Sequence, residues 1–178
     1  MRKLKNSELN RLDVDSFKQA SKSPLILVLD NVRSTHNVGS IFRTADAFRV
    51  QEIMLCGITA TPPHKDIRKT ALGATESVQW KYCENTIDAI QNLQSKGVVV
   101  LAIEQAEGST SLSDFNPLPD TTYALIFGHE VKGVSQDVVS AANTVLEIPQ
   151  EGTKHSLNVS VSVGMVVWQL FSSLTKRF

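Results

Sequence analysis

Short, unbroken apolar runs alternate with segments of helical spacing along this chain, and no other feature of the sequence constrains the fold as strongly. The runs at 25–30, 98–103 and 123–127 show no regular polar alternation, which predicts strands buried on both faces. Apolar residues recur at helical spacing within 38–48 and 86–95. This alternation predicts an α/β fold, a largely parallel sheet with helices on both faces.

Shorter patterns predict the remaining elements of the domain, which are strands at 52–56, 78–82 and 145–148, a short helix at 136–142 and a long final helix at 157–174. The segment 61–71 contains two prolines followed by basic residues, so we expect a turn there. Residues 1–24 are expected to form a basic N-terminal extension with a short helix around 9–17. Residues 25–178 are then long enough for one well-packed domain.

The net charge of zero argues against the basic surface of many nucleic-acid-binding domains. The charge is uneven, however, because residues 1–81 hold 13 Lys+Arg against 8 Asp+Glu, and residues 82–178 hold 5 against 10. We expect the basic half to offer a footprint for phosphates, with Lys65, Arg68 and Lys69 as candidate contacts. An ordinary solvated loop explains the same charges.

The two cysteines, Cys56 and Cys83, lie in apolar or strand-like segments without metal-ligand spacing. We expect buried free thiols in a reducing compartment, and therefore a cytoplasmic protein. No apolar run reaches the roughly 20 residues of a membrane span. No apolar segment follows the basic N-terminus to complete a signal peptide.

Ligands of a parallel α/β sheet bind at the carboxyl ends of its strands, which directs attention to the loops after residues 30, 103, 127 and 148. The first loop leads into a helix that carries Asn37, Gly39 and Arg43. Gly39 early in a helix indicates close approach of another backbone or of a ligand. Asn37 can instead cap a helix that begins at Val38, and Arg43 can instead pair with Asp46 on the surface.

The loop after residue 127 contains Gly128, Glu130, Gly133 and Ser135. Gly128 lets a ligand approach the main chain, and the Glu130 carboxylate can accept hydrogen bonds from hydroxyl or amide donors. Gly133 and Ser135 are typical of a turn and of the N-cap of the next helix. Turn chemistry alone also explains this pattern.

The last informative segment leads into the final helix, where Ser156 can serve as the N-cap and Asn158 falls in the first turn. The helix is apolar around most of its circumference, which predicts either complete burial or a subunit interface. A homodimer through this C-terminal helix is the simpler explanation in a chain of 178 residues.

The histidines show no metal-ligand spacing, and we expect no metal site at His36, His64, His129 and His155. The sequence contains no P-loop, no G-x-G-x-x-G dinucleotide motif and no G-x-S-x-G nucleophile elbow. These absences fit a cofactor that carries no phosphate.

Taken in order, the three segments resemble the three motifs of the SpoU/TrmH branch of the SPOUT RNA methyltransferases. The matching residues are Asn37, Gly39 and Arg43 in the first motif, Gly128, Glu130, Gly133 and Ser135 in the second, and Ile148, Pro149, Gly152, Ser156, Leu157, Asn158 and Val159 in the third. The resemblance covers about 25–170. After Asn158 this sequence has Val-Ser-Val-Ser, where the family often has alanines.

The resemblance implies methylation of a ribose 2′-hydroxyl in RNA with S-adenosylmethionine as cofactor. It also implies a homodimer with its active site at the interface and a trefoil knot near the C-terminus of each chain. The implied cofactor contacts are Ile103, Gly128, Ile148 and Leu157. The key catalytic role falls on Arg43, supported by Asn37, Glu130, Ser156 and Asn158. Because a guanidinium stays protonated in proteins, we expect Arg43 to grip a phosphate and orient the ribose rather than to accept a proton.

Compact members of this family act mostly on transfer RNA, and only about 24 residues precede the first expected strand, so we expect transfer RNA as the substrate. The alternatives are a ribosomal RNA 2′-O-methyltransferase and a non-catalytic RNA-binding protein of the same fold. A SPOUT enzyme that methylates a base nitrogen and a structural homodimer with an unrelated small ligand also stay open.

Overall fold

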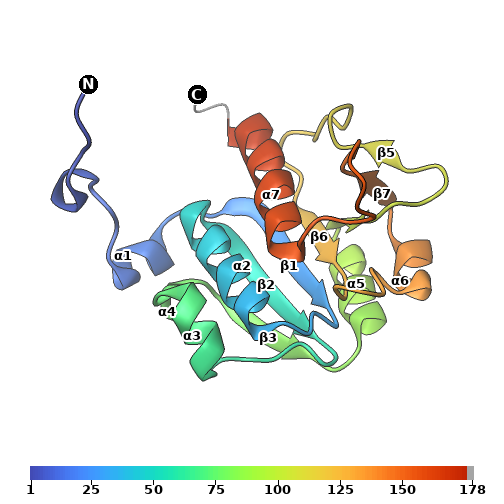
Figure 1. The fold of residues 1–178 in the computed structure, drawn as a ribbon, viewed down its shortest axis with the longest axis horizontal. Helices are drawn as coiled ribbons and strands as arrows, with labels where there is room; N and C mark the ends of the chain where they lie inside the picture. The colour runs from blue at the N-terminus through green and yellow to red at the C-terminus, as the bar shows by residue number, and fades with distance from the viewer. Residues whose placement is uncertain (176–178) are drawn as a thin grey trace.

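The centre of the molecule is one sheet of seven strands, seen in a computed structural model that describes residues 1–175. The strands are β1 (Ser23–Asp30), β2 (Val50–Cys56), β3 (Trp80–Cys83), β4 (Val99–Ile103), β5 (Thr110–Ser111), β6 (Tyr123–Phe127) and β7 (Thr144–Glu147). Neighbouring strands all pair in parallel, in the order β3-β2-β1-β6-β4-β7-β5 (Figure 1). The expected parallel sheet is confirmed.

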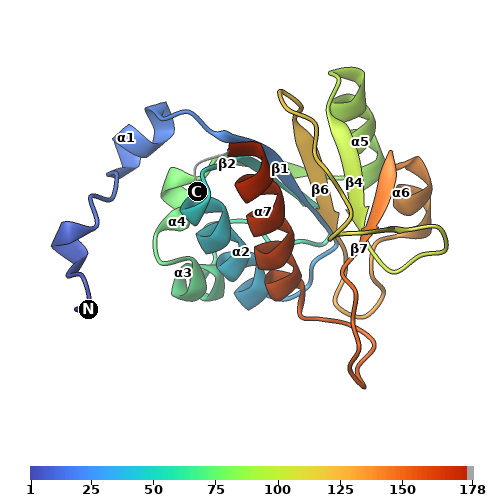
Figure 2. The same cartoon turned by 90° about the horizontal axis from the view of Figure 1, so that it is seen from above.

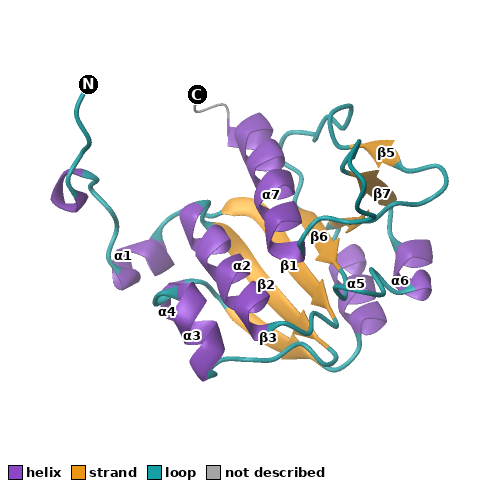
Figure 3. Cartoon of the chain, in the orientation of Figure 1, coloured by secondary structure: helices purple, strands orange, loops and turns teal. Residues whose placement is uncertain are grey.

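Helices cover both faces of this sheet (Figure 3). They are α1 (Val14–Gln19), α2 (Thr35–Ala47), α3 (Lys65–Ala71), α4 (Ala74–Ser77), α5 (Thr86–Ser95), α6 (Gln136–Ala141) and α7 (Val159–Thr175), with a 3₁₀ turn at Asn6–Glu8. One core contains side chains of α2, α3, α4 and α7, and a separate core contains those of α5 and α6. None of the helices within residues 1–175 is both long and apolar enough to cross a membrane.

The alternation of side chains along β1 explains why its sequence is apolar without interruption. Leu25, Leu27 and Leu29 lie in the core with α2 and α7, whereas Ile26 and Val28 lie in the core with α5. Because successive side chains of a strand point to opposite faces, a strand covered on both sides needs apolar residues at every position. The expectation of doubly buried strands is therefore confirmed here.

The close approach predicted for Gly39 is confirmed, and the neighbour is α3. A Cβ at Gly39 would lie 2.0 Å from the Thr70 Oγ1 and 2.4 Å from the Ile67 carbonyl oxygen. Helix α2 itself begins at Thr35, and the Ser34 hydroxyl oxygen accepts from the Asn37 N–H at 3.3 Å. The prediction that Asn37 caps a helix starting at Val38 is therefore wrong, because Ser34 holds the cap position and frees the Asn37 amide.

The turn expected at 61–71 is largely the helix α3, which the two prolines precede rather than interrupt. The His64 Nδ1 accepts from the Asp66 N–H at 3.2 Å and so caps this helix. A proline ahead of the first turn does not oppose a helix, since the first N–H groups have no helical partner. The basic residues of the segment are consequently helical, and α4 and β5 are further elements that the sequence patterns missed.

The N-terminal segment reaches away from the sheet (Figure 2). The helix expected around 9–17 lies later, at Val14–Gln19, because the Asp13 carboxylate caps it by accepting from the Ser16 N–H at 2.7 Å. Phe17 is its one buried residue and joins the core of α2. Strand β1 begins at Ser23, so the sheet already starts within the expected extension 1–24. The division of the chain into an N-terminal extension and a methyltransferase domain stays a prediction.

The final helix α7 is half covered in this chain. Val163, Val167 and Leu170 are fully buried, while Val161 and Met165 on the other side are 50% and 44% exposed. Complete burial within one chain is therefore excluded, and the interface expectation stays open. A trefoil knot near the C-terminus also stays a prediction, with which the parallel topology is consistent.

Candidate active site

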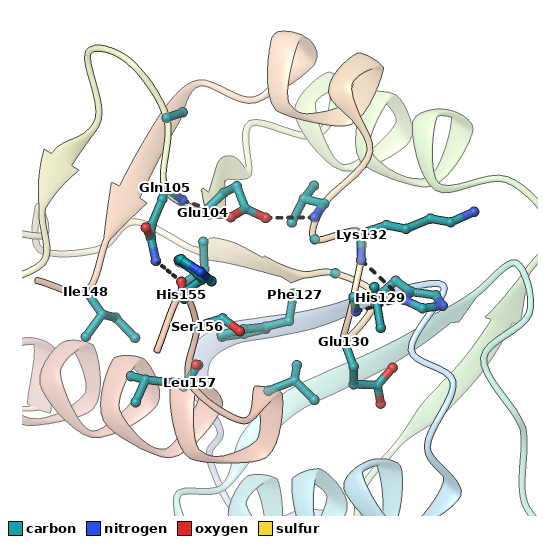
Figure 4. A pocket seen from close by; sticks show the side chains of 18 of the residues that line it. Glu104, Gln105, Phe127, His129, Glu130, Lys132, Ile148, His155, Ser156 and Leu157 are labelled. Carbon is teal, nitrogen blue, oxygen red and sulfur yellow. Dashed lines mark hydrogen bonds between the residues drawn. The ribbon is translucent and has the colours of Figure 1, made fainter. Parts of the chain in front are cut away.

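A cavity of about 480 Å³ lies at the carboxyl ends of β4, β6 and β7, where the start of α7 closes it (Figure 4). The rule for parallel α/β sheets places ligand sites at this edge. The residues expected to contact the cofactor all line this cavity, and they are Ile103, Gly128, Ile148 and Leu157. The volume falls within the range of about 300–1,000 Å³ that is usual for small-molecule sites.

The wall formed by residues 128–134 is a tight hairpin. His129 and Gly133 exchange backbone hydrogen bonds of 3.0 and 2.8 Å. A Cβ at Gly128 would lie 2.1 Å from the Gly133 carbonyl carbon and 2.2 Å from the Val134 nitrogen. The lack of a side chain at Gly128 therefore lets the hairpin backbone pack closely at this edge of the cavity, and the expected approach of a ligand to its main chain stays a prediction. Gly133, at φ +68°, has the backbone conformation of the expected turn.

Three of the expected site residues form a hydrogen-bonded cluster beside the cavity. The Asn37 Nδ2 donates to the Glu130 Oε1 at 2.9 Å, and the Asn158 Nδ2 donates to the Asn37 Oδ1 at 3.2 Å. The Glu130 carboxylate also accepts from the Arg33 and Ser34 N–H groups at 3.0 and 2.9 Å. Ser34 is the N-cap of α2, so the Glu130 carboxylate lies at the N-terminal end of this helix, where a negative charge is stabilised.

The Glu130 carboxyl is held in its charged form. Burial raises its pKa, but donation from the Arg33 N–H, the Asn37 amide and the Ser34 N–H outweighs burial, and the pKa lies below its ordinary value. Three accepted hydrogen bonds favour a carboxylate over a carboxylic acid. Glu130 is consequently a poor proton acceptor near neutral pH and a good anchor for the loop before α2.

The start of α7 differs from the expectation for Ser156. The helix begins at Val159, and the Asn158 Oδ1 accepts from the Ser160 N–H at 2.9 Å and from the Ser160 hydroxyl at 2.6 Å. Asn158 is thus the capping residue, and the prediction that Ser156 caps the helix is wrong. Ser156 lines the cavity and is exposed. In the described chain its hydroxyl makes no hydrogen bond to the cluster.

Arg43 lies outside this cavity. It is exposed on α2 and lines a separate hollow together with Ser40, Thr44, Lys69 and Thr70. The surface pair with Asp46 is not formed among residues 1–175, and the Asp46 carboxylate accepts from the Ser77 hydroxyl instead. The hollow brings two cationic side chains together with hydroxyl groups.

Sequence reasoning missed the carboxylate of Asp30, which is 2% exposed. It accepts from the Thr86 Oγ1 at 2.6 Å, and from the Ser135 N–H and Oγ at 3.0 Å each. These bonds connect the end of β1 to the first residue of α5 and to the N-cap position of α6. Ser135 occupies the expected N-cap position, but its hydroxyl donates to Asp30 rather than capping α6. The sequence offers one signal for this contact, because Asp30 is a charged residue at the end of an otherwise apolar strand.

The histidines, acidic residues and cysteines give no indication of a metal centre in the part of the chain that the structure describes. Among residues 1–175 no group of three or more His, Cys, Asp or Glu side chains is arranged for a metal ion. Cys56 is buried and burial raises the pKa of its thiol to about 12, whereas Cys83 is only half-buried, contrary to expectation. Both thiols are free, as expected.

The comparison with known families decides the assignment. Residues 24–168 match the model of the SpoU rRNA methylase family, which is most of the chain. The chain belongs to the SpoU methylase family. The resemblance to this family is therefore confirmed. Residues of the second and third motifs line the cavity, and Asn37 of the first motif belongs to the cluster.

A curated SpoU relative is similar to this chain over most of the chain's length. The 23S rRNA (guanosine-2′-O-)-methyltransferase RlmB of Neisseria meningitidis is 31% identical over 153 residues, which are 86% of this chain and 60% of that protein. The chain therefore spans less than two thirds of the length of this curated relative.

Solved SpoU structures share the fold. The TrmH/SpoU tRNA modifying enzyme of A. aeolicus superposes with a TM-score of 0.78 and 25% identity, covering 88% of this chain and 78% of that one. An rRNA methyltransferase of Sinorhizobium meliloti, solved with AdoMet bound, gives 0.77 and 27%, covering 86% and 58%. The SPOUT-type α/β fold is thus shown.

Proposed function

We propose that this protein transfers a methyl group from S-adenosylmethionine to a ribose 2′-hydroxyl of RNA. The observation that carries the proposal is the convergence of three motif loops. Asn37, Glu130 and Asn158 are joined by hydrogen bonds of 2.9 and 3.2 Å beside the cavity that Gly128 and Leu157 line. A protein that only bound RNA would not need hydrogen bonds that connect a small-molecule cavity to α2, the helix that carries Arg43.

The cavity suits S-adenosylmethionine. It carries both polar and apolar lining, and its main chain comes from the ends of three parallel strands, where backbone N–H and C=O groups face a ligand. Ile103, Ile148 and Leu157 offer apolar contact for a planar base, and the backbone around Gly128 offers hydrogen bonds. When bound, S-adenosylmethionine supplies an electrophilic methyl group for the 2′-oxygen of a ribose.

Arg43 is the residue we assign to the RNA side of the reaction. Its guanidinium is exposed in a hollow that also contains Lys69 and the hydroxyl groups of Ser40, Thr44 and Thr70. A guanidinium binds phosphate through two parallel hydrogen bonds, which fixes both position and orientation. We therefore assign Arg43 to the phosphate next to the target ribose, and Lys69 to the same RNA strand.

Glu130 and Asn158 have a supporting role in this mechanism. The ionised Glu130 holds the residues just before α2 through the Arg33 and Ser34 N–H groups, and the first turn of α2 through the Asn37 amide. Asn37 connects that turn to Asn158 at the start of α7. The helix that carries Arg43 is thereby positioned relative to the cofactor cavity. Precise placement of two reactants accounts for a large part of the rate enhancement in a displacement reaction.

A homodimer through α7 is part of the proposal. Val161, Met165 and Trp168 recur at helical spacing on one side of α7, and each is about half exposed. Trp168 also packs on Phe48, with ring centroids 5.8 Å apart, so the apolar surface continues onto the end of α2. Phe48 also lines the Arg43 hollow, so this hollow borders the surface that we propose to be buried against a second copy.

Ribosomal RNA is the substrate class that the relatives favour. RlmB of Neisseria meningitidis is a 23S rRNA enzyme, and the S. meliloti neighbour is also an rRNA methyltransferase. The expectation of transfer RNA came from a comparison of this short chain with compact members of the family. These relatives do not support it. Transfer RNA stays the second candidate because of one observation. The tRNA modifying enzyme of A. aeolicus shares this fold, and the match extends over 78% of that enzyme's chain.

Methyl transfer to separated RNA pools tests the proposal. Purified protein is incubated with methyl-labelled S-adenosylmethionine and either 23S rRNA or a tRNA pool, both transcribed in vitro so that no site is already methylated. Label in 23S rRNA supports the favoured substrate, and label in tRNA supports the second candidate. Cofactor binding without transfer to either pool would favour the non-catalytic RNA-binding alternative.

A further inference from the structure

Glu104 and Gln105, the two residues that follow β4, reach opposite walls of the cofactor cavity (Figure 4). Both line the cavity. The Glu104 Oε2 accepts from the Val134 N–H at 2.9 Å, on the hairpin wall at 128–134. The Gln105 Nε2 donates to the His155 carbonyl oxygen at 2.8 Å, on the wall at 149–157. Neither residue belongs to the three motifs.

The wall at 149–157 has little else to hold it in place. Every residue of this segment is exposed, so burial contributes little to its position. Among residues 1–175, the bond from Gln105 is the one hydrogen bond that ties the segment to the rest of the chain. Segments with few packed contacts and few hydrogen bonds open at low free-energy cost. The same segment nevertheless supplies Gln150, His155, Ser156 and Leu157 to the cavity lining.

The opposite wall depends on Glu104 in a different way. A Cβ at Gly133 would lie 2.1 Å from the Glu104 Oε2, so the carboxylate packs directly against the hairpin backbone. Its second oxygen, Oε1, accepts from the Gln105 N–H at 2.9 Å. The Glu104 carboxylate thus accepts from the backbone of both Gln105 and the hairpin, and it fixes the positions of both relative to the end of β4.

We propose that Glu104 and Gln105 are positioning residues for S-adenosylmethionine, which set the separation of the two cavity walls. The inference rests on the proposed function, since it concerns the same cavity. The bond from Gln105 holds the 149–157 wall in the arrangement that binds the cofactor. Without it, part of the population has that wall displaced, and the apparent affinity for the cofactor falls by the same fraction.

The test compares Gln105→Ala with a matched control, Gln94→Ala. The Gln94 Nε2 donates to the Ala141 carbonyl oxygen at 2.8 Å and to the Asn143 Oδ1 at 3.3 Å, both outside the cavity. We expect Gln105→Ala to weaken S-adenosylmethionine binding about three- to tenfold, the effect of one lost hydrogen bond. We expect its KM for the cofactor to rise in parallel, with kcat and the KM for RNA unchanged, because the bond acts on cofactor binding alone.

Proteolysis provides a readout that does not need the cofactor. Lys154 lies in the 149–157 segment, and trypsin should cleave there several-fold faster in Gln105→Ala than in Gln94→Ala. For the other wall, Glu104→Ala should weaken cofactor binding, and Glu104→Gln should restore most of it because its amide oxygen can still accept from Val134.

The inference is overturned if Gln105→Ala binds the cofactor within twofold of the wild type, whatever its cleavage rate at Lys154. It is also overturned if Gln94→Ala weakens binding equally, since the effect would then not depend on the cavity wall. Failure of the wild-type protein to bind S-adenosylmethionine would contradict the proposed function itself. Proteolysis needs no cofactor. Faster cleavage at Lys154 in Gln105→Ala would therefore still show that Gln105 holds the 149–157 wall, even if the proposed function were contradicted.

Discussion

The side-chain amide of Asn158 donates a hydrogen bond of 3.2 Å to the side-chain oxygen of Asn37, which lies 121 residues earlier in the chain. Asn37 in turn donates to Glu130 at 2.9 Å. Asn158 also caps α7 through its side-chain oxygen. One amide group therefore connects the ends of two helices, and a change at either end is expected to shift the other.

Replacing Glu130 with Gln should lower both stability and activity. The substitution leaves one acceptor oxygen where two accept from Arg33, Ser34 and Asn37. We expect a loss of about 1–2 kcal/mol in the free energy of unfolding, typical of hydrogen bonds to a charged group that is partly exposed. Methyl transfer should fall about 100-fold, since small misplacement of reacting groups has effects of that size.

Urea denaturation and single-turnover assays measure these two effects. Glu52→Gln is the control, because the Glu52 carboxylate accepts from the exposed Lys81 at 2.8 Å far from the cavity. A surface ion pair of this kind contributes about 0–1 kcal/mol. An equal loss of activity in both variants would show that Glu130 has no particular role.

The contribution of Glu130 to stability should depend on pH. Its folded pKa lies below its unfolded value of about 4.3, so folding favours the ionised form. This contribution is fully present above the unfolded pKa and is lost as pH falls through the folded pKa. The difference in unfolding free energy between wild type and Glu130→Gln should be constant near pH 7 and shrink below about pH 4. A difference that persists unchanged to pH 3 would contradict the assignment.

Arg43→Lys should retain RNA binding but lose turnover. Lysine keeps the charge without the planar pair of donors, so we expect methyl transfer to fall at least about tenfold with RNA affinity little changed. Arg43→Ala should in addition reduce the slope of log affinity against log salt by about 1, as for one lost phosphate contact. Lys96→Ala, an exposed residue at the C-terminal end of α5 and outside the hollow, is the control. Near wild-type turnover in Arg43→Lys would refute the gripping role.

The packing of α2 on α3 should be sensitive to a single methyl group. A Cβ at Gly39 would lie 2.0 Å from the Thr70 Oγ1 and 2.4 Å from the Ile67 carbonyl oxygen. Gly39→Ala should therefore destabilise the chain by about 1–3 kcal/mol through overpacking, measured by thermal or urea denaturation. Gly152→Ala, where nothing lies within 4 Å of the added Cβ, should change stability by less than about 0.5 kcal/mol.

The surface of α7 predicts the oligomeric state. Sedimentation analysis should show a dimer for the wild type and a monomer when both Val161 and Met165 are changed to Asp, because the charges would be buried at the interface without partners. Leu118→Asp is the control, since Leu118 is 65% exposed on a different part of the chain. A wild-type monomer, or a double variant that stays dimeric, would contradict the proposed interface.

The sequence was informative about the sheet because doubly buried strands leave a direct record in the residues. Every position of β1 from Leu25 to Leu29 is apolar, and each lies in one of the two cores. Helix boundaries were less predictable, because competing caps lie close together. Ser34 and Asn37 can both cap α2, and Ser156 and Asn158 can both cap α7. The structure selects Ser34 and Asn158, which leaves Asn37 to bond Glu130.

Residues that act through long-range contacts were the hardest to predict. Asp30 accepts from Ser135, 105 residues later, and Glu104 accepts from Val134 across the cavity. Neither contact has a local pattern, because each depends on which strands lie side by side. The order β1-β6-β4-β7 brings these loops together, and no spacing within one segment encodes that order.

Nucleoside analysis of the methylated RNA tests the central claim most directly. RNA labelled by the wild-type protein with S-adenosylmethionine is digested to nucleosides, and the position of the methyl group is identified by mass spectrometry. The account predicts a 2′-O-methylated nucleoside, formed by the wild type and strongly reduced in Arg43→Lys. A methyl group on a base nitrogen, or transfer that is indifferent to Arg43, would contradict it.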